Sequence, residues 1–170
     1  MDVVLVSIPL KNYVDVPTDE LLGKVVIDTM DYYPDRDGHI DGLDEGSTTS
    51  SELLQAHLPG SHVVKALDNI FFQHLASLPR PSGAQDRSAL AIAGDDADAK
   101  VTVVHVLDEI GYDSVDLGSL AQGWRTQPDT PAYGIVYAAD PADWTAGAQP
   151  VKADLLAARA MAATRLSDPR

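Results

Sequence analysis

Two short apolar stretches near the start of the chain decide the fold: VVLVSI at Val3–Ile8 and KVVIDT at Lys24–Thr29. Both consist mainly of β-branched and other aliphatic residues, without the alternation of polar and apolar positions that is typical of a strand with one wet face. Continuous runs of this kind indicate strands that are covered on both faces, as in parallel sheets. The sequence therefore predicts that these stretches lie inside a parallel sheet with helices on both sides.

Further strands and helices alternate along the rest of the chain. Three more short apolar runs predict strands at His62–Ala66, Ala89–Ala93 and Ser114–Leu117. Helical patterns begin at Thr49, where Glu52 completes a capping box, and recur from Ala97 to Gly111 and from Val151 to Ala162. Strands that alternate with helices predict an α/β class, here a Rossmann-like three-layer fold with a mostly parallel sheet. We expect residues 1–170 to form a single domain.

Composition limits the classes of function. A length of 170 residues fits one domain, and the absence of cysteine excludes disulfides, thiolate metal sites and a cysteine nucleophile. Twelve basic against 26 acidic residues give a net charge of −14, which repels nucleic acid and anionic membranes. No stretch resembles a signal peptide or a membrane span, so we expect a cytoplasmic protein with neither nucleic acid nor membrane as partner.

The polar motifs have simpler explanations than catalysis. The acidic segment Asp31–Glu45 does not match a calcium-binding loop, because counting from Asp35 places glycine at the fourth position rather than the sixth. The five histidines form no pair spaced for one metal ion, so no metal site is expected. Three aspartates closely follow Gly94, which suits helix capping and would repel phosphate. No Gly-x-Ser-x-Gly, Gly-x-Gly-x-x-Gly or Walker motif occurs.

Position in the fold gives a better indication of a site. Ligands of open α/β sheets bind beyond the carboxyl ends of the strands. Pro9, Asp31 and Asn69 follow the first three predicted strands and would converge on one rim. Two irregular segments, Met30–Ser47 and Gln122–Pro150, are long for a compact domain and are therefore interpreted as functional loops.

Six segments at and around these strand ends occur in a distinctive order: Val3–Pro9, Val25–Pro34, Val63–Ile70, Ala93–Asp96, Asp116–Leu120 and Thr130–Gly134. In this order they resemble the family of NADP oxidoreductases that use a deazaflavin coenzyme. The resemblance covers roughly residues 2 to 137 and implies an NAD(P)-binding Rossmann fold. It also implies hydride transfer between NADP(H) and an 8-hydroxy-5-deazaflavin coenzyme.

The resemblance assigns roles to particular residues. The cofactor-binding residues that it implies are Ile8, Pro9, Leu10, Thr29, Asp31, Asp68 and Ile70. The implied substrate-binding residues are Asn69, Trp124, Pro131 and Tyr133. Hydride transfer between stacked rings needs alignment and exclusion of water rather than an acid or base, so no catalytic residue is named.

Members of that family carry a glycine-rich phosphate loop in their first strand–helix unit, and this sequence contains none. We therefore expect an N-terminally truncated, partial NAD(P)-binding domain. In the strand order 3-2-1-4-5-6, truncation would leave Val3–Ile8 at the sheet edge. We expect this edge to pair with a second copy of the chain, giving a homodimer, or with a separately encoded N-terminal half, or else to make the chain poorly soluble. Three hypotheses remain open: a deazaflavin–NADP reductase, a reductase of another small substrate, and a non-catalytic remnant or interaction module that no longer binds the dinucleotide.

Overall fold

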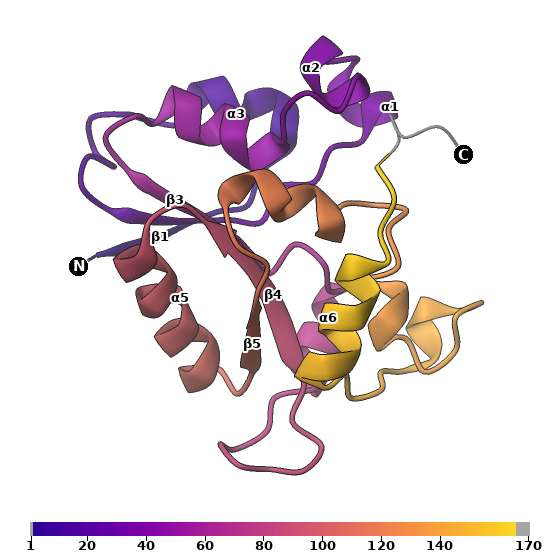
Figure 1. The fold of residues 1–170 in the computed structure, drawn as a ribbon. Coiled ribbons are helices and arrows are strands. Elements are labelled where there is room, and N and C mark those ends of the chain that lie inside the picture. Colours follow the sequence, from indigo (N-terminus) through magenta and orange to yellow (C-terminus); the bar gives the residue numbers. More distant parts are fainter. Residues whose placement is uncertain (1, 166–170) are drawn as a thin grey trace.

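A computed structural model describes residues 2–165 and contains a five-stranded sheet with helices on both faces (Figure 1). The strands are β1 (Val3–Val6), β2 (Val25–Asp28), β3 (His62–Ala66), β4 (Ala89–Gly94) and β5 (Asp113–Asp116), in that spatial order. Three neighbouring pairs are parallel, and β3 with β4 is antiparallel. All five predicted strands and the mostly parallel α/β sheet are confirmed.

Three helices follow the sequence patterns: α3 (Ser50–His57), α5 (Ala97–Glu109) and α6 (Ala153–Met161). The Thr49 hydroxyl accepts the Glu52 N–H at the start of α3, as the capping box predicts. Shorter helices interrupt the loops: α1 (Pro34–Asp37), α2 (Asp41–Asp44) and α4 (Phe72–Ser77), with 3-10 turns η1 (Leu10–Asp15), η2 (Leu120–Thr126), η3 (Ile135–Tyr137) and η4 (Trp144–Ala146). These segments are too short to produce a periodic pattern, which is why the sequence did not predict them. None of the described helices is long and apolar enough to cross a bilayer.

The central strands are largely apolar on both faces because helices cover both sides of the sheet. Val25 and Ile27 of β2 belong to a core shared with α5 and α6, whereas Val26, between them, belongs to a second core shared with α3 and η1. Successive side chains of a strand point to opposite faces, so both faces of β2 are covered. In Figure 1, α3 lies on one side of the sheet, and α5 and α6 lie on the other.

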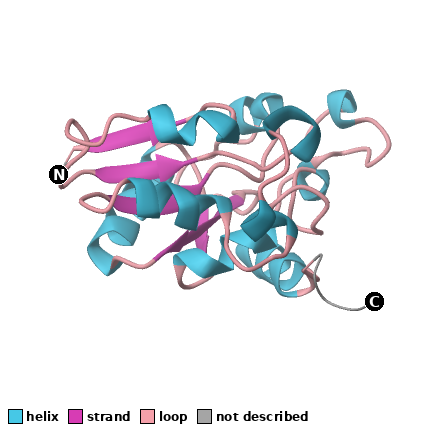
Figure 2. Cartoon of the chain, turned by 90° about the horizontal axis from the view of Figure 1, so that it is seen from above, coloured by secondary structure: helices cyan, strands magenta, loops and turns pink. Residues whose placement is uncertain are grey.

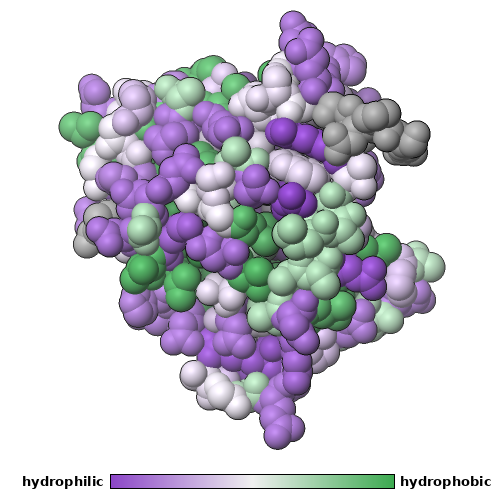
Figure 3. Space-filling model, viewed as in Figure 1, coloured by the Kyte–Doolittle hydropathy of each residue, from purple (hydrophilic) through white to green (hydrophobic). Residues whose placement is uncertain are grey.

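The surface and the strand ends differ in character. Figure 3 shows a largely hydrophilic face whose apolar atoms gather near the middle, over α6, where Leu155 and Met161 are exposed. Figure 2 shows loops and short helices gathered beyond one end of the sheet. The segments Met30–Ser47 and Gln122–Pro150 belong to this irregular part, so the fold collects both predicted loops near the carboxyl ends of the first strands.

Strand β1 lies at the edge of the sheet, and within residues 2–165 it pairs with β2 alone. The carbonyls of Asp2 and Val6 accept bonds from the amides of Val25 and Thr29. Because alternate residues of a strand direct their backbone groups to opposite sides, those of Val3 and Leu5 face outward. The side chains of Val3 and Leu5 are 37% and 53% exposed.

This edge leads to a prediction about association. We expect the wild-type chain to sediment as a dimer through β1. The substitution Val3→Lys should shift it towards monomer, because a charged residue on an edge strand opposes pairing with an identical strand. Analytical ultracentrifugation of the two proteins at equal concentration measures the change. A wild-type chain that sediments as a monomer would contradict the expectation.

Candidate functional site

Two cavities lie beside the irregular end of the sheet. The smaller one, about 350 Å³, is called here the strand-end cavity, and it is lined by Leu5, Ser7, Thr29, Asp31, Leu67, Asp68, Ile70, Phe71, Phe72, Leu75, Tyr133 and Trp144. The larger one, about 850 Å³, is called the large cavity and lies among residues 32–50, 124–131 and 162–165. The strand-end cavity receives residues from the carboxyl ends of the parallel strands β1, β2 and β3, the edge beyond which open α/β sheets bind ligands.

A buried lysine lies behind the strand-end cavity. Lys65 of β3 is 1% exposed and is in register with Asp28 of β2. Its ammonium nitrogen lies 3.8 Å from a carboxylate oxygen of Asp28 and 3.8 Å from one of Asp68. It also donates a hydrogen bond to the carbonyl of Met30. The lysine thus holds the ends of two strands and the segment after each of them together.

Asp28 is a well-satisfied carboxylate. One of its oxygens accepts the Met30 N–H at 2.8 Å, and the other accepts the Ser51 hydroxyl of α3 at 2.6 Å. Its second oxygen also lies 3.8 Å from the Lys65 ammonium nitrogen, so each oxygen of this buried side chain has a polar partner. Asp28 therefore serves as the structural counter-ion of Lys65.

Asp68 and Asp31 are different. Among the described residues, neither carboxylate oxygen of Asp68 has a hydrogen-bond partner, nor has one oxygen of Asp31. Burial raises the pKa of Asp31 well above its ordinary value, and the Lys65 ammonium opposes that shift. Burial likewise raises the pKa of Asp68 against the pull of Lys65. Burial lowers the pKa of Lys65, but the three carboxylates outweigh it and leave that pKa raised.

A pair of tyrosines links the linings of the two cavities. The hydroxyls of Tyr33 and Tyr133 are hydrogen-bonded to each other, and Tyr33 lines the large cavity while Tyr133 lines the strand-end cavity. Burial raises the pKa of both phenols, so both remain protonated at neutral pH. The Tyr133 ring also lies 6.0 Å from the Trp144 ring, centroid to centroid. Trp144 in turn fits against Gly134, where a Cβ atom would come within 2.3 Å of its ring.

The backbone is strained at the same place. Leu67, directly after β3, has φ of 64°, a left-handed conformation that residues with a Cβ rarely adopt. Such strain costs on the order of 1–3 kcal/mol and persists only where surrounding contacts impose it. Here it turns the chain so that Leu67 and Asp68 both line the strand-end cavity.

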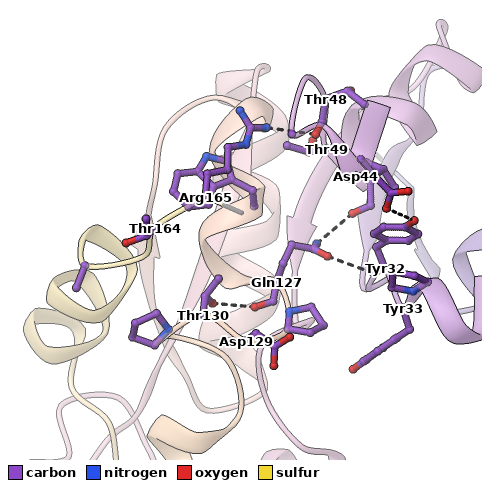
Figure 4. Close-up of a pocket in the computed structure, with 18 residues that line it drawn as sticks. Tyr32, Tyr33, Asp44, Thr48, Thr49, Gln127, Asp129, Thr130, Thr164 and Arg165 are labelled. Atoms are coloured by element: carbon purple, nitrogen blue, oxygen red, sulfur yellow. Dashed lines mark hydrogen bonds between the residues drawn. The ribbon is translucent and has the colours of Figure 1, made fainter. Parts of the chain in front are cut away.

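The large cavity has hydrogen bonds along its wall (Figure 4). The Gln127 side chain accepts the Tyr32 N–H at 3.2 Å and donates to the Ser50 hydroxyl at 3.1 Å. Arg165 reaches across from the far side and donates to the carbonyl of Thr48 at 3.2 Å. These polar groups hydrogen-bond to one another without a ligand, so this part of the cavity wall is already formed.

The structure brings together about half of the residues predicted for the site. Thr29, Asp31, Asp68, Ile70 and Tyr133 line the strand-end cavity. Of the residues predicted to bind substrate, Trp124 and Pro131 line the large cavity instead, on the other side of the tyrosine pair.

Four other predicted residues lie in neither cavity. Ile8 and Pro9 are exposed beyond β1. Leu10 is fully buried in the core beside α3. Its apolar side chain packs there rather than in either cavity. Asn69 is also fully buried, and its amide group donates to the carbonyl of Ala132 at 3.0 Å, which fixes the loop that carries Tyr133.

Sequence reasoning missed the residues that organise the site. No site role was predicted for Lys65 or Asp28, because each lies within or at the end of a run assigned to the core. A charged residue inside an otherwise apolar strand was the available signal, since it requires a buried partner. Tyr33, Phe71 and Trp144 carried no such signal, because aromatic residues are common in cores. Within residues 2–165 no group of three or more histidine, aspartate or glutamate side chains is placed to hold a metal ion.

Comparisons with known proteins agree on the fold. No family model matches the sequence. The putative protein YjhV of Escherichia coli K12 is 42% identical over 53 residues, which are 31% of this chain and 39% of that protein. A hypothetical protein of Sinorhizobium meliloti, SMa0349, has a similar structure, with a TM-score of 0.62 and 27% identity over 75% of this chain and 62% of its own.

A second solved structure is a putative F420-dependent NADP-reductase from Arthrobacter sp. FB24, with a TM-score of 0.57 and 22% identity over 69% of this chain and 55% of that one. The chain spans less than two thirds of the length of each of these three proteins. The similarity confirms the predicted Rossmann-like fold.

The bare carboxylate of Asp68 leads to a prediction about stability. Because its pKa is raised in the folded chain, the folded state loses stability as pH rises from the ordinary value of 3.8 through the folded-state pKa. Asp68→Asn removes this charge, so it should stabilise the chain at neutral pH by about 1.4 kcal/mol for each unit of the shift. The gain should vanish as pH falls below the ordinary value.

Urea unfolding at several pH values measures this difference. The exposed Asp35 provides a matched control, and Asp35→Asn should change stability little at any pH. A loss of stability in Asp68→Asn at neutral pH would show that the ion pair with Lys65 outweighs the cost of burial.

Proposed function

We propose that the chain forms the hydride-transfer end of an NADP-dependent oxidoreductase site, with a deazaflavin coenzyme as the hydride partner. The observation that carries the proposal is the convergence of Thr29, Asp31, Asp68, Ile70 and Tyr133 on one cavity at the carboxyl ends of parallel strands. Ligands of open α/β sheets bind beyond the carboxyl ends of the strands. The Arthrobacter neighbour, described as a putative F420-dependent NADP-reductase, lends support through its shared fold.

The strand-end cavity suits a nicotinamide ring. Aromatic side chains of Phe71, Tyr133 and Trp144 offer flat apolar walls, and the carboxylates of Asp31 and Asp68 offer acceptors for the ring's carboxamide N–H groups. When bound, the nicotinamide supplies the hydride. The chain's own residues orient the ring, exclude water and hold it at one depth above the strand ends.

The described helices offer few groups that could bind the pyrophosphate of the dinucleotide. The three described helices of eight or more residues, α3, α5 and α6, each carry an acid in the first turn: Glu52, Asp98 and Asp154. At α5 the Asp96 side chain already accepts the Ala99 N–H at 2.8 Å. A phosphate would meet negative charge where a helix start normally offers N–H groups and a favourable dipole.

The tyrosine pair bears on how two rings would meet. Direct hydride transfer requires stacked rings, so both must occupy the same cavity. Under the proposal the deazaflavin ring enters from the large cavity after the Tyr33–Tyr133 hydrogen bond opens. Trp124 and Pro131, which line the large cavity, then contact the outer part of that coenzyme.

A second candidate, a non-catalytic binding module, is favoured by the acidic starts of the long helices. A folded chain with neither turnover nor affinity for a nicotinamide ring would support that alternative. A reductase of another small substrate remains open on the same cavity and differs only in the hydride acceptor.

The affinity for the whole dinucleotide is predicted to be low. Losing several charge-assisted bonds to the pyrophosphate, at roughly 1.5–3 kcal/mol each, moves a micromolar site to about millimolar or weaker. Calorimetric titration of the 170-residue chain with NADP is the measurement. A micromolar dissociation constant would show that other groups of this chain hold the phosphates.

We expect the chain to transfer hydride from NADPH, at millimolar concentration, to the oxidised deazaflavin. The loss of the deazaflavin's absorbance measures the rate. Phe72, which is 69% exposed, lies at the rim of the strand-end cavity, so Phe72→Ala should leave the fold intact. It should lower kcat/KM by about threefold to tenfold through loss of ring contact. Val101→Ala, an exposed apolar position on α5, is the matched control and should have no effect. Equal rates for Phe72→Ala and wild type would place the reaction elsewhere.

A further inference from the structure

We infer that the strand-end cavity is selective for a flat organic cation, and that it binds such a cation more tightly than a neutral ring of the same shape. The identity of the cation rests on the proposed function: it is the oxidised pyridinium form of nicotinamide, and the neutral ring is the reduced dihydropyridine. The inference rests on two features of one cavity: carboxylates that outnumber the nearby positive charges, and aromatic walls.

The first step is the local balance of charge. Asp28, Asp31 and Asp68 surround a single cation, Lys65. Asp28 is bonded to a backbone N–H and a hydroxyl, and it shares the lysine with Asp68 at the same distance of 3.8 Å, so one ammonium faces three carboxylates. The three carboxylates therefore exceed the positive charge available to them within the described chain.

The second step is the lack of alternative partners. Besides Lys65, the titratable groups that act on these carboxylates are the phenols of Tyr33, Tyr133 and Tyr137, which carry no positive charge. The Arg36 guanidinium also acts on Asp31, whose backbone carbonyl accepts its hydrogen bond at 2.6 Å. The guanidinium of Arg36 lies over the Tyr33 ring, 4.8 Å from its centroid, but it is held by Asp37 at 2.8 Å. Among residues 2–165 no second cation reaches Asp68.

The third step is the position of Asp68. Its side chain is fully buried, both its oxygens lack hydrogen-bond partners in the described chain, and the residue lines the cavity. Buried polar groups in folded proteins are almost always bonded, so an exception calls for an explanation. A cationic ligand in the cavity supplies the missing charge.

The fourth step is the chemistry of the walls. Phe71, Phe72, Tyr133 and Trp144 border the same cavity, and the Phe71 and Phe72 rings are 4.6 Å apart, centroid to centroid. Aromatic faces attract cations, most strongly when water is excluded. Aromatic rings and carboxylates together favour a flat cation with apolar edges over a hydrated metal ion, which prefers several oxygen ligands.

For a nicotinamide ligand, the consequence is a preference between redox states. Carboxylates beside the ring stabilise the positive charge that the ring carries only in its oxidised form. Asp31 and Asp68 would thus favour bound NADP⁺ over bound NADPH. Transfer of a hydride from the reduced ring to the deazaflavin would be the favoured direction on the protein.

The test uses three small probes in calorimetric titrations at neutral pH: 1-methylnicotinamide, a pyridinium cation; nicotinamide, its neutral counterpart; and benzyltrimethylammonium, an aromatic cation of another class. Wild type should bind 1-methylnicotinamide about tenfold more tightly than nicotinamide, as one charge-assisted contact predicts. Asp68→Asn and Asp31→Asn should each reduce that ratio severalfold. Asp35→Asn, on the exposed surface, should leave it unchanged.

The outcomes separate the inference from the proposed function. Equal binding of 1-methylnicotinamide and nicotinamide would overturn the cation preference while supporting a nicotinamide site. Binding of benzyltrimethylammonium alone would support the cation preference and contradict the proposed function. Failure of all three probes to bind a folded wild-type chain would overturn both, and a preference that survives in both Asp variants would overturn the role assigned to these carboxylates.

Discussion

The buried Lys65 is the charge around which the carboxyl edge of the sheet is organised. Moving an ammonium out of water costs several kcal/mol unless opposite charges and hydrogen bonds compensate. Here Asp28 faces it across the β2–β3 register, Asp68 approaches it from the segment after β3, and the carbonyl of Met30 accepts a hydrogen bond from it. A register slip of one residue would turn Lys65 into the apolar core shared with α5 and α6, where nothing pairs with it. The ion pair therefore fixes how β2 and β3 align, and with them the floor of the cavity.

Much of the fold was predictable because local pattern and tertiary role coincide. A strand covered on both faces is apolar at most of its positions. β4 and, apart from its last residue Asp28, β2 show this pattern directly. The start of α3 was equally predictable, since its cap is formed by residues that are three apart in the sequence. The direction of β4 was not predictable, because an apolar run reads the same whether its neighbour is parallel or antiparallel. Helix α4 was missed because six residues give too few turns for a period to show.

The site was predictable only as far as the strand ends. Thr29, Asp31 and Asp68 follow apolar runs, and the topology of parallel strands brings them together. The groups that give the cavity its chemistry come from farther away: Tyr133 meets Tyr33 across 100 residues. Such contacts depend on the path of irregular loops, for which the sequence carries no periodic signal. The same limit explains why Leu10 and Asn69, adjacent to strand ends, turned into the core rather than the cavity.

Two carboxylates with the same neighbour have opposite environments, and this contrast is informative about what the cavity is for. Asp28 has every partner that a buried acid needs, so the chain is able to satisfy a carboxylate at this depth. Asp68 shares Lys65 with it but has no hydrogen-bond donor in the described chain, and it follows the strained Leu67. A fold that needed Asp68 only for packing would be more stable with an uncharged residue there. Under the proposed cation site, this cost is local instability at a position where a bound positive charge would recover it.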